Sequence, residues 1–156
     1  MQYEFLLWIA VLANVVHQLE EIYLDARNYV ESYGIPKMSD GVFYYLQASF
    51  LLAGIVMAAV GWRAPAFSLM YPILIMMNII GVHLIMTIKY RKYSPGLLTG
   101  VVFILPVGIA CLWGAAQDGV LNARVVVIAS LLAIVYSLVP FLLIRMKKML
   151  YETKRK

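Results

Sequence analysis

The sequence predicts an all-α integral membrane protein, a bundle of five transmembrane helices that forms a single polytopic domain over residues 1–156. Three observations support this fold class. Hydrophobic residues make up 63% of the chain and charged residues only 13%, whereas a soluble domain is about 45 to 50% apolar. Five segments are apolar over about 20 residues or more. Lys and Arg gather at alternate connections between these segments.

Each apolar segment is long enough to cross a bilayer. A helix rises about 1.5 Å per residue, so about 20 residues traverse a hydrocarbon core of about 30 Å. The expected spans are residues 3–24, 43–62, 67–90, 97–117 and 125–145. No basic region precedes the first segment and no small-residue cleavage site follows it, so we expect it to be retained as a span.

The basic residues predict the orientation, because Lys and Arg favour cytoplasmic connections. Apart from Arg63 and Arg124, all of them lie between the first and second spans, at the end of the third span and between it and the fourth, or at the end of the fifth span and beyond it. We therefore expect the N-terminus outside and the C-terminus in the cytoplasm of a multi-pass protein of the cell (inner) membrane. The net charge of +5 follows from this pattern, so membrane lipids, and no nucleic acid, are the expected partners.

Two local features are expected outside the spans. The first helix is expected to continue beyond the membrane to Tyr33 and to end at Gly34, which is followed by a proline. The segment Tyr93-Ser94-Pro95-Gly96 resembles a helix start, with Ser94 as the N-cap and Pro95 in the first helical position. This segment is also open to a second interpretation, as a lid over a site.

The stretch His17-Gln18-Leu19-Glu20-Glu21 places a histidine and two carboxylates in an apolar helix. A charged side chain near the bilayer centre costs roughly 2.5 to 3.5 kcal/mol, so such residues are candidates for function. At 100° per residue, Asn14 and both glutamates fall within about 60° of His17. Their shared face must point into the bundle, because lipid would leave the carboxylates unsolvated.

The other histidine, His83, is expected at a matching depth in the cytoplasmic half. His17 lies about 21 Å from the outer end of its span, and His83 lies about 24 Å along a span that runs the same way. Asn78 is about 140° from His83 around an α-helix and is not expected on its face. Further residues expected to surround the site or contact substrate are Asn14, Tyr44, Gln47, Thr87, Tyr90 and Tyr93.

Two histidines and two carboxylates can hold a divalent metal, with zinc as the first expectation and iron or manganese as alternatives. The spacing resembles the H-x-x-E-H pattern of inverted zinc peptidases, in which the first and last residues bind metal and the Glu is the base. On that pattern the expected ligands are His17, Glu21 and His83. Glu20 is then the expected catalytic residue, a general base acting on a bound water.

The chain also resembles the HXXEE family, bacterial membrane proteins marked by that motif, a second histidine and a Y-x-P-G motif. All three marks are present over the first two thirds of the chain: His17, Glu20 and Glu21; His83; and Tyr93, Pro95 and Gly96. The resemblance implies that these residues form one site. It does not name a substrate.

Several functions fit these patterns. The first is an intramembrane metalloenzyme acting on a lipid or other apolar substrate at the cytoplasmic leaflet, by metal-assisted hydrolysis or, with iron, by oxidation. The second is a metal-free lipid isomerase that uses general acid and base catalysis. The third is a protein that binds or transports a cation, a proton or a small ligand. A purely structural polar network, with a glutamate paired to a histidine or to Arg27, is the remaining interpretation.

Overall fold

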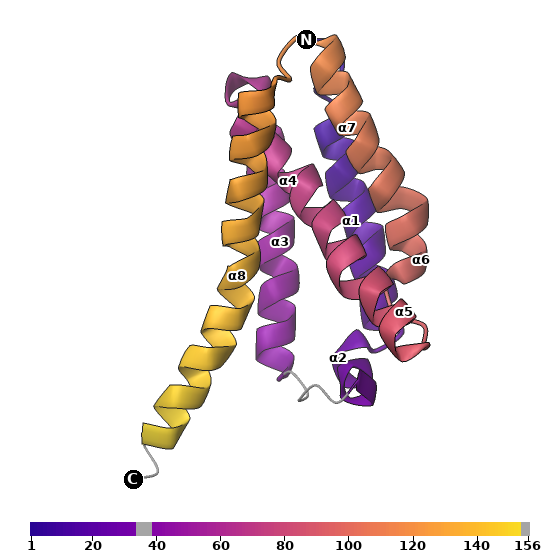
Figure 1. The fold of residues 1–156 in the computed structure, drawn as a ribbon, viewed down its shortest axis with the longest axis vertical. Helices are drawn as coiled ribbons and strands as arrows, with labels where there is room; N and C mark the ends of the chain where they lie inside the picture. Colours follow the sequence, from indigo (N-terminus) through magenta and orange to yellow (C-terminus); the bar gives the residue numbers. More distant parts are fainter. Residues whose placement is uncertain (34–38, 154–156) are drawn as a thin grey trace.

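The computed structural model describes residues 1–33 and 39–153, with side chains described for 1–32 and 39–138. Within these ranges the regular structure is entirely helical. The start of α1 and the far end of α8 lie at opposite ends of the elongated bundle (Figure 1).

The long helical stretches follow one another along the chain, and two of them contain a π-helical segment. They are α1 (Leu6–Tyr23); α3 (Asp40–Val60); α4 (Pro65–Asn78) with η3 (Ile79–Leu84) and α5 (Ile85–Tyr90); α6 (Leu97–Thr99) with η4 (Gly100–Ile104) and α7 (Leu105–Gln117); and α8 (Ala123–Thr153). The short elements are α2 (Ala26–Tyr29), η1 (Val30–Tyr33) and η2 (Gly61–Arg63). The π-helical segments are η3 and η4.

Three of these stretches are long and apolar enough to cross a membrane, which makes the chain a membrane protein. They are Asp40–Arg63, Pro65–Tyr90 and Leu97–Gln117, with mean hydropathies of 1.8, 2.0 and 2.2. These stretches coincide with the expected spans 43–62, 67–90 and 97–117. The first helix, α1, has 18 residues and carries the polar cluster, and the described apolar part of α8 is the shorter segment Ala123–Leu138.

The buried core is organised around α4. This helix crosses the bundle and packs against α3, α7 and α8 (Figure 1). Its side chains Leu69, Leu74 and Ile75 are almost completely buried, whereas many large apolar side chains of the other helices remain exposed. Exposed apolar side chains are what a surface in contact with lipid requires.

The first helix ends earlier than expected. It stops at Tyr23, and Asp25 has a φ of 51°, so the backbone turns into the separate short helix α2. Asp tolerates this left-handed conformation because its short side chain can bond locally, and Asn28 donates a hydrogen bond to it. A continuous helix to Tyr33 is therefore wrong, and the expected end at Gly34 falls outside the described residues.

The fourth span also begins differently from the sequence expectation. Ser94 and Pro95 precede the helix, which begins at Leu97 with Gly96 as its N-cap, at a φ of 93°. Gly96 has no side chain to cap the helix, and the amides of Leu98 and Thr99 donate to the Tyr93 hydroxyl at 3.2 Å and to the Glu20 carboxylate at 2.8 Å. The Ser94 hydroxyl lies instead 3.1 Å from Nδ1 of His83, because the chain passes close to that imidazole before the helix starts.

The end of the bundle that holds the N-terminus contains a cluster that we call the acidic clasp, formed by Glu4, Trp62 and Asp118. The Asp118 carboxylate accepts hydrogen bonds from the backbone amides of Gln2 and Tyr3, both at 2.9 Å. It also accepts one from the Trp62 indole at 2.9 Å, and Glu4 accepts one from the Trp62 amide at 3.2 Å. Partial burial opposes ionisation of Asp118, but these donors outweigh it and lower the pKa of the carboxyl.

Candidate metal centre

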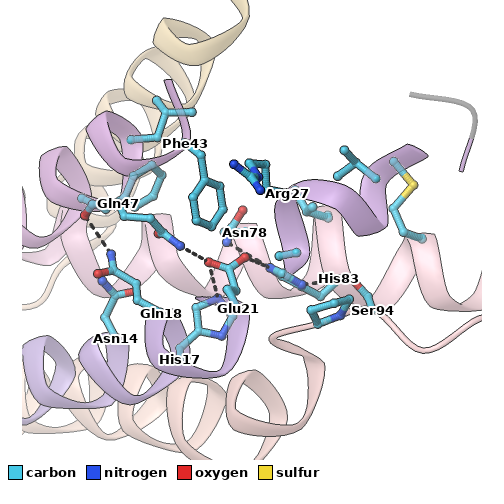
Figure 2. A pocket seen from close by; sticks show the side chains of 18 of the residues that line it. Asn14, His17, Gln18, Glu21, Arg27, Phe43, Gln47, Asn78, His83 and Ser94 are labelled. Carbon is cyan, nitrogen blue, oxygen red and sulfur yellow. Dashed lines mark hydrogen bonds and ion pairs between the residues drawn. The ribbon is translucent and has the colours of Figure 1, made fainter. Parts of the chain in front are cut away.

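The structure brings His17, Glu21 and His83 together at the other end of the bundle. Each offers a ligand atom within 4.8 Å of the other two. The Glu21 oxygens lie 3.4 Å from Nε2 of His83 and 3.9 Å from Nε2 of His17 (Figure 2). Both histidines are almost completely buried, and their rings stand perpendicular with centroids 4.9 Å apart. The three residues expected to bind a metal therefore form one compact cluster.

The π-helical segment η3 brings a further residue to this cluster. Asn78 lies with its Nδ2 atom 3.4 Å from Nε2 of His83, although an α-helical count placed it on another face. A π-helix bonds residue i to i+5, so residues five apart come round to nearly the same face. The expectation that Asn78 lies away from His83 is wrong for this reason.

On the Nδ1 side of each ring, the imidazole lies close to a hydroxyl group. Nδ1 of His83 lies 3.1 Å from the Ser94 hydroxyl, and Nδ1 of His17 lies 3.2 Å from the Thr99 hydroxyl. The backbone amide of Ser94 in turn donates to the Thr87 hydroxyl at 3.1 Å. Because both Nδ1 atoms are engaged in this way, both Nε2 atoms face Glu21.

Gly96 packs directly against both histidines. A Cβ at this position would lie 2.5 Å from Cε1 of His17 and 2.9 Å from Cε1 of His83. The residue also has a φ of 93°, which a side chain disfavours. The segment Tyr93-Ser94-Pro95-Gly96 is therefore packed onto the site, and its glycine permits the close approach.

Glu20 takes a different position from its neighbour Glu21. Its carboxylate accepts hydrogen bonds from the Thr99 amide at 2.8 Å, from the Thr99 hydroxyl at 2.5 Å and from the Tyr93 hydroxyl. It is not among the residues that line the cavity beside the cluster. The Glu20 carboxylate is thus engaged by Tyr93 and Thr99, and its general-base role stays a prediction. Thr99, which connects it to His17, was not singled out from the sequence.

The sequence comparisons agree with this grouping. The family model described as "Protein of unknown function with HXXEE motif" matches residues 8–111. The chain belongs to the HXXEE family. No curated protein and no solved structure matches it. The matched region contains all of the HXXEE motif, His83 and the Tyr93–Gly96 segment, which the fold assembles into one cluster.

Two glutamine side chains connect the HXXEE helix to α3. Gln47 donates to Oε2 of Glu21 at 2.7 Å, and Gln18 donates to the backbone carbonyl of Gln47 at 2.9 Å (Figure 2). Gln47 was expected near the site, whereas Gln18 was not singled out, although it is the second residue of the motif. Its buried position next to His17 was not apparent without the α3 backbone.

The other expected neighbours lie farther out. Tyr44 is 53% exposed and does not line the cavity. Thr87 acts on the site through Ser94, and the ammonium group of Lys89 lies 5.1 Å from the centre of the Tyr90 ring. Asn14, by contrast, is buried and lines the cavity. The structure therefore brings Asn14 and Gln47 to the cavity, whereas Tyr44 and Tyr90 do not line it.

A cavity of about 520 Å³ opens beside the cluster. Figure 2 shows His17, Glu21, His83 and Asn78 on its wall with Phe43 and Arg27 across from them. Its apolar lining includes Phe43, Leu46 and Phe50 of α3, Leu74 and Met77 of α4, and Val82 and Met86 of the η3–α5 stretch. The volume is within the range of about 300 to 1,000 Å³ that is typical of small-molecule sites.

Proposed function

We propose that the protein is a small membrane-embedded metalloenzyme that acts on a lipid or another apolar substrate by metal-assisted hydrolysis. The observation that supports it most directly is the convergence of two imidazole nitrogens and the Glu21 carboxylate on the wall of an apolar cavity. Nε2 of His17 is buried and has no hydrogen-bond partner among the described residues. A bound cation would use this nitrogen and balance the buried carboxylate.

A structural salt bridge explains the cluster less well than a cation does. It would require an imidazolium at a site where burial opposes the charge, and two imidazoles with centroids 4.9 Å apart cannot favourably both carry one. If both are neutral and protonated at Nδ1, two lone pairs face the carboxylate at 3.4 and 3.9 Å, and only that of His83 has a donor nearby, the Asn78 amide at 3.4 Å. Such an arrangement of acceptors is unfavourable in a buried site unless a cation or a proton lies among them, and a single cation can bind all three groups.

The donor set fits zinc, and also iron or manganese. Two histidines and a glutamate form a known catalytic zinc set that leaves a position open, and two histidines with a carboxylate suit iron(II). Ligand atoms with zinc bonds of about 2.0 to 2.1 Å at tetrahedral angles lie about 3.3 to 3.4 Å apart. Nε2 of His83 lies at this spacing from Oε1 of Glu21, at 3.4 Å, and Nε2 of His17 lies 3.9 Å from Oε2, which is wider. When bound, such a metal would polarise a carbonyl or phosphoryl oxygen and activate water.

The cavity indicates the class of substrate. Phe43, Phe50 and Met77 offer apolar surface, and the metal cluster supplies the polar part of the wall. Arg27, which pairs with Asp40, also lines the cavity. An amphiphile can place its chain along the apolar side chains and its ester or phosphoester group at the cluster, which is the arrangement that lipid hydrolysis requires.

The proposal includes five membrane spans, with the N-terminus outside, the C-terminus in the cytoplasm and the site in the cytoplasmic half of the inner membrane. The charge distribution supports this orientation, because three basic residues lie at the end of the bundle that holds the site: Lys89, Arg91 and Lys92. The single cysteine, Cys111, is buried and can be replaced by serine. In that background, a membrane-impermeant maleimide should label Gly119→Cys in intact cells. A label appearing only after lysis contradicts the orientation.

Metal analysis tests the proposal first. Protein purified in detergent without chelator is expected to contain about one zinc, iron or manganese ion per chain. His17→Ala, His83→Ala and Glu21→Gln should each remove it. Glu31→Gln is the matched control, because Glu31 is an exposed carboxylate near the same end and should keep the metal. A wild-type protein of normal stability that neither contains nor takes up these metals refutes the metal centre.

Activity is tested with metal-loaded and metal-stripped protein in liposomes of total lipid extract from the expression host. Mass spectrometry is expected to detect a hydrolysed lipid only with the loaded protein. Isomerised lipid formed without metal would instead favour acid and base catalysis. A pH-driven cation flux that depends on Glu21 in the same liposomes would favour transport. Either result contradicts the hydrolase proposal.

A further inference from the structure

We infer that Glu20 is a positioning residue: acting through the Thr99 hydroxyl, it holds His17 in the tautomer that carries its proton on Nδ1 and presents a free Nε2 to the cavity. This assignment replaces the general-base role expected from the sequence. Its first test requires no metal, and only its second test rests on the proposed function.

The direction of each hydrogen bond follows from the donors around Glu20. An ionised carboxylate can only accept hydrogen bonds, and the Thr99 amide, the Thr99 hydroxyl and the Tyr93 hydroxyl all reach its oxygens. The Thr99 hydroxyl has a single proton, which it gives to Oε2 of Glu20 at 2.5 Å. Only its lone pairs then remain for other partners.

The consequence for His17 is a defined proton position. Nδ1 lies 3.2 Å from the Thr99 oxygen, which can only accept from it, so Nδ1 carries the hydrogen. In a neutral imidazole the other nitrogen is then an acceptor. That nitrogen is Nε2, which is buried, faces Glu21 and has no donor among the described residues. The carboxylate outside the cavity thus favours a lone pair on Nε2 inside it, together with the Gly96 carbonyl, which also contacts the His17 ring.

Glu20 is itself fixed by the helix that begins at Leu97. The amide of Thr99 belongs to the first turn of this helix, where backbone N–H groups have no intrahelical acceptor and a negative charge is favoured. These contacts join α1 to the start of the fourth helical stretch. They also occupy the oxygens of Glu20 and direct them away from the cavity, which is why we assign it a positioning task.

The tautomer can be observed by ¹⁵N NMR of histidine-labelled, metal-free protein in micelles. We expect the wild type to show His17 protonated at Nδ1, with its signals assigned by comparison with His83→Ala. Thr99→Val removes the hydroxyl but keeps the side-chain shape, so it should shift His17 toward the Nε2-protonated form. Thr99→Ser should restore the wild-type spectrum.

Tyr93→Phe is the matched control, because it also removes one hydroxyl bond to Glu20 but leaves the bond to Thr99 intact. It should leave the His17 tautomer unchanged. The inference is overturned if the wild type carries the proton on Nε2. It is equally overturned if Thr99→Val has no effect, or if Tyr93→Phe shifts the tautomer as strongly as Thr99→Val does.

Zinc titration provides the second test. Loss of the group behind a metal-binding histidine typically lowers metal affinity about 10- to 100-fold. We expect that loss for Thr99→Val and Glu20→Gln, and near wild-type affinity for Thr99→Ser. If Glu20→Gln binds zinc normally but loses turnover, Glu20 is the base and the positioning role is wrong. If no variant, wild type included, binds zinc, the proposed function fails while the tautomer result stands.

Discussion

The two ends of the bundle both use buried or half-buried acidic residues, but they use them differently. In the acidic clasp, the Asp118 and Glu4 carboxylates accept hydrogen bonds from backbone amides and from the Trp62 indole. In the cluster of His17, Glu21 and His83, Glu21 receives one amide hydrogen bond, from Gln47, and faces two imidazole nitrogens. A carboxylate surrounded by donors is already stabilised, whereas one that also faces two imidazole nitrogens has room for the cation that the proposed function places there.

At both ends of the bundle, a glycine allows side chains from elsewhere in the chain to approach the backbone closely. Gly61, with a φ of 58°, leaves space for the Glu4 side chain in the clasp, and Gly96 leaves space for His17 and His83. A Cβ would collide with a structural carboxylate at one end and with two proposed ligands at the other. Substitutions at the two ends are therefore expected to separate stability from metal binding.

The largest effect is expected from Gly96→Ala. The added methyl group would lie within 3 Å of both imidazoles, and the backbone conformation adds strain of about 1 to 3 kcal/mol. We expect no stoichiometric zinc in the purified variant and a lower Tm, measured by elemental analysis and thermal melting.

Gly119→Ala is the control for this variant, because Gly119 also has a positive φ but nothing lies within 4 Å of the added methyl group. It should suffer the backbone strain and keep its zinc. If Gly96→Ala binds zinc as the wild type does, the packing of Gly96 against the histidines is not needed for the metal centre.

A smaller effect is expected from Ser94→Ala, which removes the hydroxyl beside Nδ1 of His83. Zinc affinity should fall about 10- to 100-fold, because the imidazole loses the partner that orients it. Titration of the metal-free variant measures this. Ser137→Ala is the matched control: Ser137 also lines the cavity, but its hydroxyl bonds to its own helix, so the affinity should be retained. Equal affinities for the two variants would contradict the role of Ser94.

The smallest effect on the site is expected from Asp118→Asn in the clasp. The variant should melt at a lower temperature at neutral pH and keep its full zinc content, since the clasp is at the opposite end from the cluster (Figure 1). Loss of zinc would show that the two ends are not independent.

The pH dependence of the same variant follows from the lowered pKa of Asp118. A lowered folded-state pKa contributes stability above the unfolded-state value, about 3.9, which is lost as the pH falls through the folded-state value. The difference in Tm between wild type and Asp118→Asn should therefore shrink below about pH 4. A difference in Tm that is constant down to pH 2 would contradict this contribution.

The sequence by itself determined the apolar stretches and the residues of the proposed metal centre. Apolar runs of about 20 residues define helices whatever their neighbours, and three of them are confirmed. His17 and Glu21 are four residues apart, so they share a face of any α-helix. The rise per residue also placed His83 level with His17, and the two rings lie 4.9 Å apart.

Only the tertiary structure decided which other groups contact these residues. The π-helical turn brings Asn78 to His83, a contact that an α-helical angle of 100° per residue does not predict. Thr99 is 82 positions from His17, and Asp118 is 115 from Tyr3, so no local pattern indicates either contact. The two adjacent glutamates took different positions for the same reason. Glu21 meets α3 and η3, whereas Glu20 meets donors at a helix start that lies far along the chain.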